Sequence, residues 1–297
     1  MKKIWFPIFT CGFLLSILII TIIKYNNERN PVAPLLSVTA ALTAAPAKDS
    51  GAVPAPSNQP TPSTGPADNA GSVLSHSELN KNTLASLPSC TIINISKNKK
   101  DIVKIAFYYE KITKDLKLRM KGKSYKKDCT VPYEDLRYVR VLYYGFDNKT
   151  HIGELVVNRQ IAKDITAIFK DLYLSEYPIE KMVLIDDYDA DDEASMADNN
   201  TSSFNFRRMT GSKNLSKHAL GLAIDINPLY NPYVKINDSG TIVSPEKAYE
   251  YQDRKLDNPY YITKNDVCYK AFIKRGFTWG GSWKSIKDYQ HFEKSLN

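Results

Sequence analysis

The stretch FNFRRMTGSKNLSKHALGLAIDINP, residues 204–228, places a histidine and an aspartate seven positions apart with a glycine between them. If residues 220–227 are extended, side chains alternate, and Asp225 projects from the face opposite the apolar residues. Gly221 lets the backbone bend closely, so His218 and Asp225 can converge on one point. This segment predicts two ligands of a single site, carried by a turn and the strand that follows it.

A second polar cluster lies in WGGSWKSIKDYQHFE, residues 279–293, where Asp288 and His291 stand three apart and can face the same way on a helical turn or tight loop. Three nitrogen or oxygen ligands with an open fourth position are usual for catalytic zinc, and a nearby carboxylate is the expected general base. We therefore predict a metal site to which His218 and Asp225 contribute two ligands and the second cluster, with Asp288 and His291, contributes the third. From the residues alone, a core histidine, a strand-end cap and a helix cap stand as alternatives.

The N-terminus has the composition of a membrane segment. Met-Lys-Lys precedes a nearly uncharged run from Ile4 to Ile23, and about 20 apolar residues are what a helix needs to cross a bilayer. A cleaved secretory signal is the alternative, but its apolar core is usually shorter and is followed by small residues. We expect residues 1–30 to hold a cytoplasmic start and an uncleaved transmembrane signal-anchor, with the rest of the chain outside the membrane.

Residues 31–88 are rich in Ala, Pro and Ser and cannot bury enough apolar surface to offset their ordering entropy, so we expect a disordered linker. Residues 89–297 are long enough for a single domain with a sizeable core. Cys90, Cys129 and Cys268 fall in this part without close spacing, which excludes a CxxC zinc site. One disulfide plus one buried thiol, or three buried thiols, remain open.

The net charge of +8 is concentrated in residues 97–128, which contain twelve Lys or Arg against four Asp or Glu. Such a run is usually a solvated face, and the alternative is attraction to anionic wall polymers or lipid head groups. Aromatic residues are not organised there for base stacking. We therefore expect no nucleic-acid partner.

Apolar spacing predicts a helix over Ile102–Met120 and another over Gln160–Leu172. Alternating residues in 136–146 and 152–157, separated by Asp147-Asn148, predict a β-hairpin on which the second helix packs. Residues 182–185 read as a short strand that leads into a polar surface loop, residues 186–200, of the kind that often borders an active site.

The two polar clusters together resemble a known family. Ser216-x-His218-x-x-Gly221-x-Ala223-x-Asp225, then Ile-Asn-Pro and a late Gly-Phe-x-Trp-Gly-Gly-x-Trp…Asp-x-x-His-Phe-Glu, is similar to VanY-like D-alanyl-D-alanine carboxypeptidases and related wall endopeptidases of the LAS type. The similarity covers roughly residues 100–297. It implies an α+β zinc peptidase domain with a small antiparallel sheet flanked by helices, in which His218, Asp225 and His291 hold one Zn²⁺ ion.

The resemblance also implies roles for residues around the ligands. Arg207 matches the arginine that polarises the scissile carbonyl, with an exposed salt-bridge partner as its alternative. Asp288 stands where the family's catalytic carboxylate sits, although many relatives have the longer Glu there. Glu293 is expected to contact the metal ligands without binding the metal itself.

Further positions are candidates for substrate binding. Ser216 belongs to the family motif, with a turn-stabilising serine as its alternative, and Trp279 and Trp283 line the groove or only pack. Asp192 and Ser195 belong to a loop that borders the site in similar proteins, with hydrogen bonding within the loop as their alternative role. Residues 229–261, rich in Tyr, would be an insertion that closes over one side of the groove.

The function implied by the resemblance is hydrolysis of peptide bonds in bacterial peptidoglycan, whose stem peptides would be the substrate. The D-Ala-D-Ala link is preferred, which makes the protein a carboxypeptidase. The alternatives are an L-alanyl-D-glutamate endopeptidase and a non-catalytic wall-binding module. The expected location is the cell membrane, with the catalytic domain in the extracytoplasmic part of the envelope.

Overall fold

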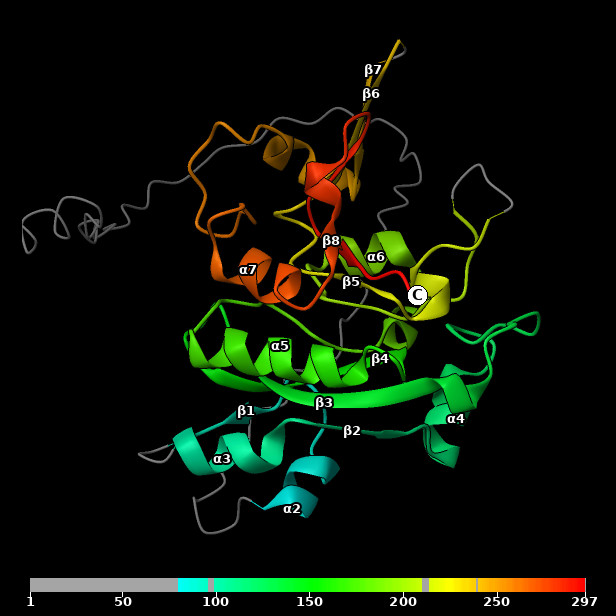
Figure 1. Cartoon of the computed structure of the whole chain (residues 1–297), viewed down its shortest axis with the longest axis vertical. Coiled ribbons are helices and arrows are strands. Elements are labelled where there is room, and N and C mark those ends of the chain that lie inside the picture. The colour runs from blue at the N-terminus through cyan, green and yellow to red at the C-terminus, as the bar shows by residue number, and fades with distance from the viewer. Residues whose placement is uncertain (1–79, 96–98, 210–213, 239, 297) are drawn as a thin grey trace, which may run out of the picture. The chain divides into compact units, whose positions relative to one another are not determined.

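The computed structural model describes residues 80–95, 99–209, 214–238 and 240–296 (Figure 1). All of them belong to one compact unit, Thr64–Asn297, while a second unit, Met1–Ser63, lies outside the described residues. The expected signal-anchor and most of the expected linker therefore lie outside them too. Within the described ranges, no helix has the length and apolar character that crossing a bilayer requires.

The described part of the chain mixes short helices with short strands. The α-helices are α2 (Lys81–Ser86), α3 (Lys99–Ala106), α4 (Lys114–Met120), α5 (Ala162–Leu174), α6 (Asp192–Ala197) and α7 (Val267–Ile273). The 3₁₀ helices are η1 (Tyr133–Asp135), η2 (Ile185–Tyr188), η3 (His218–Leu220), η4 (Glu246–Gln252) and η5 (Gly280–Ser282). The strands are β1 (Ile92–Ile93), β2 (Tyr108–Lys111), β3 (Leu136–Tyr144), β4 (Thr150–Asn158), β5 (Ala223–Asp225), β6 (Tyr233–Asn237), β7 (Gly240–Ser244), β8 (Thr278–Trp279), β9 (Lys287–Asp288) and β10 (His291–Glu293).

The strands form three antiparallel sheets, with the orders β1-β4-β3-β2, β5-β10-β8 and β7-β6-β9. The expected α+β class is confirmed, but the expectation of one small sheet is wrong. The hairpin is also confirmed, because β3 and β4 pair along their full length from Leu136 opposite Asn158 to Tyr144 opposite Thr150.

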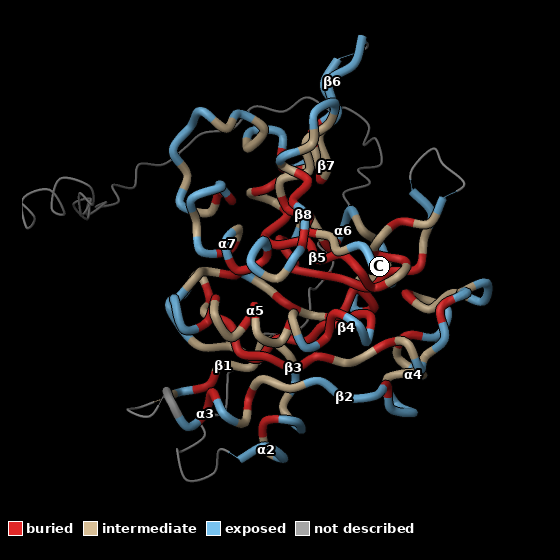
Figure 2. Tube along the Cα trace, viewed as in Figure 1, coloured by how far each residue is buried: buried red, intermediate tan, exposed pale blue. Residues whose placement is uncertain are grey.

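Helix α5 packs between the largest sheet and the strands that carry the polar clusters (Figure 1). Its buried residues, which include Ile165 and Phe169, share one hydrophobic cluster with Val139 of β3, Ile224 of β5 and Phe292 of β10. Figure 2 shows this buried centre running through β3, β4 and β5. The packing therefore buries one face of β5 and of β10 against α5, the kind of support that a site built on their residues needs.

The helix expected over residues 102–120 is wrong. Helix α3 ends at Ala106, residues 108–111 form β2, and α4 begins after Thr113, whose side chain caps it by accepting a bond from Leu116 N. Strand β2 pairs with the edge of β3, with Tyr109 opposite Val139. This long-range pairing overrides a local periodicity that suited a helix.

The strand expected over residues 182–185 is also wrong, because a side chain takes the place of a neighbouring strand. Asn200 accepts a hydrogen bond from Val183 N (2.9 Å) and donates one to Val183 O (3.1 Å). The polar loop after it contains α6, which the sequence did not predict. Its N-cap is Asp191, whose carboxylate accepts from Ala194 N.

Two further findings concern the limits of the packed domain and its cysteines. Helix α2 precedes the expected boundary at residue 89, and its Leu84 is buried against Leu142 and Ile152. Residues before that boundary therefore take part in the packing. The cysteines at positions 90, 129 and 268 are all free, but only Cys268 is buried, so the alternative of three buried thiols holds in part.

Candidate active site

Two local features bring the ligands together. Strands β5 and β10 pair in antiparallel register with His291 directly opposite Asp225. His218 begins η3, and Gly221 ends it at a φ of +66°, the left-handed conformation that glycine adopts without strain. The turn lies close to β4, because a Cβ at Gly221 would come within 2.7 Å of Asn158 N. The glycine therefore provides the close bend expected from the sequence.

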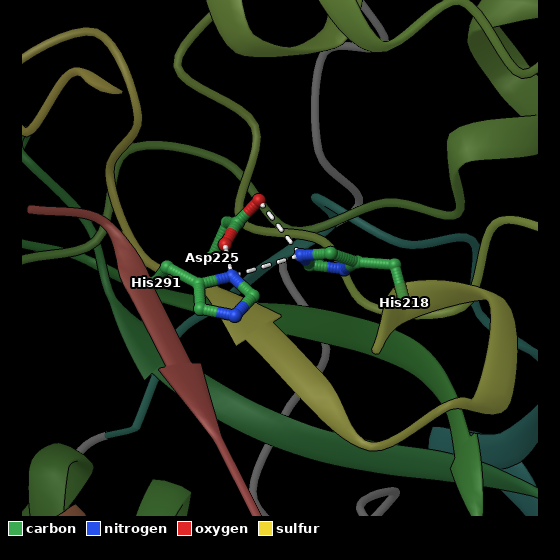
Figure 3. Close-up of side chains that lie close together, drawn as sticks. All are labelled: His218, Asp225 and His291. Carbon is green, nitrogen blue, oxygen red and sulfur yellow. Dashed lines mark hydrogen bonds and ion pairs between the residues drawn. The ribbon is translucent and has the colours of Figure 1, made fainter. Parts of the chain in front are cut away.

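The side chains of His218, Asp225 and His291 meet at one buried point (Figure 3). His218 Nε2 lies 3.2 Å from Asp225 Oδ2, and His291 Nδ1 lies 3.0 Å from Asp225 Oδ1. The two ring nitrogens are 3.2 Å apart, and the potential ligand atoms all lie within 4.8 Å of one another. Two imidazole nitrogens and a carboxylate are a donor set that suits Zn²⁺.

Each histidine has a second partner that sets its orientation. His218 Nδ1 donates to the carbonyl oxygen of Ser203 at 2.7 Å, because a carbonyl can only accept. Its Nε2 lone pair is then directed into the site. His291 Nε2 lies 3.1 Å from Glu293 Oε2, which leaves Nδ1 for the site. Such outer partners fix the tautomer of a metal-binding histidine.

The charges of the cluster favour a cation. Burial lowers the pKa of His291, but its hydrogen bonds to Asp225 and Glu293 outweigh this and raise the pKa to about 10. Burial raises the pKa of Asp225, and the charges and hydrogen bonds of His218 and His291 bring it well below its ordinary value. The field that holds a proton on His291 also attracts a divalent ion, so proton and metal compete for the same lone pair.

Asp288 has an oxygen available for chemistry. Its Oδ1 is buried and has no hydrogen-bond partner in the part of the chain that the structure describes. Burial raises the pKa of Asp288 to about 6, with His291 lowering it and Asp225 raising it. Strand β9 holds the residue opposite Tyr233 of β6, and Gly280 approaches so closely that a Cβ there would lie 2.6 Å from Asp288 O. A carboxylate with a pKa near neutrality suits a general base.

Arg207 lies beside the turn that carries His218. Its carbonyl oxygen accepts a hydrogen bond from Ser216 N at 3.2 Å, and its guanidinium forms an ion pair with Asp192. Arg207, which is expected to polarise a carbonyl, is therefore in direct contact with two of the expected substrate-binding residues, Ser216 and Asp192. Ser216 Oγ accepts from Ala219 N at 3.0 Å, which agrees with the turn-stabilising alternative.

The remaining candidates occupy different environments. The Trp283 ring is partly exposed and lies 5.5 Å from the His291 ring between centroids, so it borders the site. The structure places Trp279 in the core instead, where its Nε1 donates to Tyr289 O at 2.8 Å. Ser195 is buried as well, and its Oγ accepts from Asn200 Nδ2. Only Trp283 of these three residues contacts a proposed ligand among the described residues.

The sequence did not single out Ser203 or Asn205. Ser203 acts through its backbone carbonyl, which any residue could supply, so its identity carried no signal. Asn205 N donates to His218 O at 3.2 Å, and its side chain contacts Asp192. In the sequence, only its position two residues before Arg207 pointed to a role for Asn205 at the site.

The fold is α+β, and the polar residues of the candidate site lie on η3, β5, β9 and β10. Residues 210–294 match the family model described as D-alanyl-D-alanine carboxypeptidase, and this range contains the three proposed ligands and Asp288. No curated protein and no solved structure matches the chain. The resemblance to VanY-like enzymes is confirmed as a similarity over this range.

Proposed function

We propose that this domain is a zinc-dependent D-alanyl-D-alanine carboxypeptidase acting on peptidoglycan stem peptides. The observation that carries the proposal is the convergence of His218, Asp225 and His291 within 4.8 Å, inside the segment that matches the family. Asp288, whose carboxyl interacts electrostatically with all three residues, has an unpartnered Oδ1 that offers a base beside them. These features supply ligands and a proton acceptor in one buried cluster.

Different residues of the chain have different roles in the proposed reaction. The chemistry that a bound zinc ion supplies is a water of lowered pKa and polarisation of the substrate carbonyl. Asp288 accepts the proton of the attacking water on Oδ1 and returns it to the leaving amine. The Arg207 guanidinium donates to the carbonyl oxygen as negative charge develops there. The Trp283 ring borders the site beside His291.

The test is a digest of peptidoglycan by the purified full chain. We expect loss of one terminal alanine from pentapeptide stems, seen by mass spectrometry, and no loss after chelation or with His218→Ala. His151→Ala is the matched control, because this histidine pairs with Asp147 and Cys90 O outside the cluster. Internal cleavage between L-Ala and D-Glu would establish the endopeptidase instead. Zinc binding without any hydrolysis would indicate the wall-binding module.

We also propose that the run from Ile4 to Ile23 anchors the chain in the cell membrane with the peptidase domain outside. The sequence supports this proposal through the length of the run and the two lysines before it. Protease added to intact spheroplasts should digest the domain, and alkaline carbonate should fail to extract it. A domain protected in intact spheroplasts and digested after lysis would contradict this orientation.

A further inference from the structure

Asp192, at the first position of α6, joins two parts of the proposed site. One carboxylate oxygen, Oδ2, forms an ion pair with Nε of Arg207. The other, Oδ1, accepts a hydrogen bond from Asn205 Nδ2 at 2.8 Å. Both oxygens are therefore engaged by neighbouring protein groups, which is the arrangement of a carboxylate that orients other residues.

Asn205 connects this carboxylate to a proposed metal ligand. It is only 2% exposed, its backbone N–H donates to His218 O at 3.2 Å, and its Nδ2 also donates to Ala190 O at 3.1 Å. A buried side chain with several bonds has little freedom to move. The position of Asp192 is thus tied to the turn that carries His218.

The contact with Asp192 determines how Arg207 can act. It is an ion pair made through Nε, which is buried, and neither Nε nor the two Nη groups form a hydrogen bond with the described residues. A guanidinium is planar and has five N–H donors in a fixed fork, so holding one edge sets the direction of the rest. The backbone of Arg207 is held as well, through its bond with Ser216 N.

We propose that Asp192 is a positioning residue that holds Arg207 by its Nε edge and leaves the Nη groups to donate to the carbonyl oxygen of the scissile peptide. The inference rests on the proposed function, because it assigns Arg207 to that carbonyl. It differs from the sequence expectation, in which Asp192 contacts the substrate itself. Asp192 acts only through Arg207, and this dependence can be measured.

Glu193 provides a matched control. It is the next residue on the same helix and carries the same charge, but its carboxylate accepts from Glu246 N at 2.6 Å and from Ser244 Oγ at 3.0 Å. Those groups belong to the end of β7 and the start of η4. Glu193→Gln therefore changes the charge near α6 without touching the contact between Asp192 and Arg207.

The experiment is a double-mutant cycle in the full chain, with kcat and KM measured on a stem pentapeptide ending in D-Ala-D-Ala. We expect Asp192→Ala to lower kcat about 10- to 100-fold, with unchanged zinc content, because a displaced donor loses much of its effect on the transition state. In the Arg207→Ala background, Asp192→Ala should cause no further loss. Asp192→Asn keeps an acceptor for Nε and should recover part of kcat. Glu193→Gln should have the same effect in both backgrounds.

Two results would overturn the inference. Equal losses from Asp192→Ala with and without Arg207 would show that Asp192 acts independently, and a rise in KM at constant kcat would show direct substrate contact. A second readout does not need activity. The Nε–H signal of Arg207 in ¹⁵N spectra should be protected from solvent exchange in the wild type and unprotected in Asp192→Ala. An unprotected signal in the wild type contradicts the inference, whereas an inactive wild type with a protected signal contradicts only the proposed function.

Discussion

Nε2 of His291 lies 3.1 Å from Oε2 of Glu293, two residues further along β10. Residues two apart on a strand share a face, so the strand itself places the carboxylate beside the ring. The His-Phe-Glu spacing was visible in the sequence, where Glu293 was expected to support the ligands. The hydrogen bond of His291 lowers the pKa of Glu293, which remains ionised and accepts the ring proton.

We predict that Glu293→Gln weakens zinc binding about 10- to 100-fold, the usual effect of losing an outer carboxylate partner. The shape is kept and the negative charge behind His291 is lost. Competition with a chromophoric chelator measures the affinity, and Glu193→Gln serves as the control for a loss of charge elsewhere. Equal affinities for wild type and Glu293→Gln would show that the contact has no part in metal binding.

Asp288 provides the second prediction. Asp288→Asn should lower kcat about 10²- to 10⁴-fold with zinc content unchanged, because the amide cannot accept the proton. Asp288→Glu keeps the carboxylate and tests its reach, which the close approach of Gly280 constrains. We expect Asp288→Glu to fall between wild type and Asp288→Asn. Steady-state kinetics and metal analysis test this prediction. Loss of zinc in Asp288→Asn would instead show that Asp288 is a metal ligand.

The third prediction concerns the bend after His218. Gly221→Ala places an L-residue at a φ of +66°, which costs about 1–2 kcal/mol, and puts its Cβ 2.7 Å from Asn158 N. We expect both lower stability and weaker zinc binding. Gly122→Ala is the control, because Gly122 has a φ of +79° with nothing within 4 Å of an added Cβ. Equal unfolding free energies for the two variants in urea would contradict the prediction.

The fourth prediction concerns a buried carboxylate outside the site. Glu154 on β4 accepts hydrogen bonds from Arg119 at 2.6 and 3.0 Å, from Tyr138 at 2.6 Å and from Ser89 at 2.8 Å. Burial raises its pKa, but Arg119 and the other donors outweigh this and bring the pKa below its ordinary 4.5. The carboxylate therefore contributes stability above about pH 4.5, and this contribution is lost as the pH falls through the lowered pKa.

Glu154→Gln should lower the free energy of unfolding by about 3 kcal/mol at pH 7, since it leaves a buried ion pair without one partner. The difference between wild type and variant should shrink as the pH falls below 4. Urea titrations at pH 7, 5 and 3.5 measure it. A difference that stays constant over this range would mean that ionisation of Glu154 does not contribute.

Local patterns predicted part of the fold and site. The alternation around Asp147-Asn148 is sufficient to specify the β3–β4 hairpin, since pairing and turn are neighbours in sequence. The spacing of His218, Gly221 and Asp225 likewise encodes one turn and one strand, which is why two of the converging residues could be found together.

The rest depended on distant partners. Strand β2 exists because β3 offers it an edge, and Val183 has no strand partner because Asn200 takes that place. The pairing of Asp192 with Arg207 joins residues from α6 and from the segment before η3, which no local periodicity relates. Asp288 and His291 were expected on a helical turn or tight loop and stand on two successive strands.

Because of the register of β5 with β10, the proposed zinc ion would join the two strands in addition to its catalytic role. Asp225 and His291 are separated by 66 residues, and the cysteines at positions 90, 129 and 268 form no disulfide. A metal that joins both closes a long loop in the folded chain, and because an unfolded chain does not hold these ligands together, the free energy of metal binding adds to the stability of the fold. Starving the cell of zinc would then lower the stability of this domain and remove its catalytic activity.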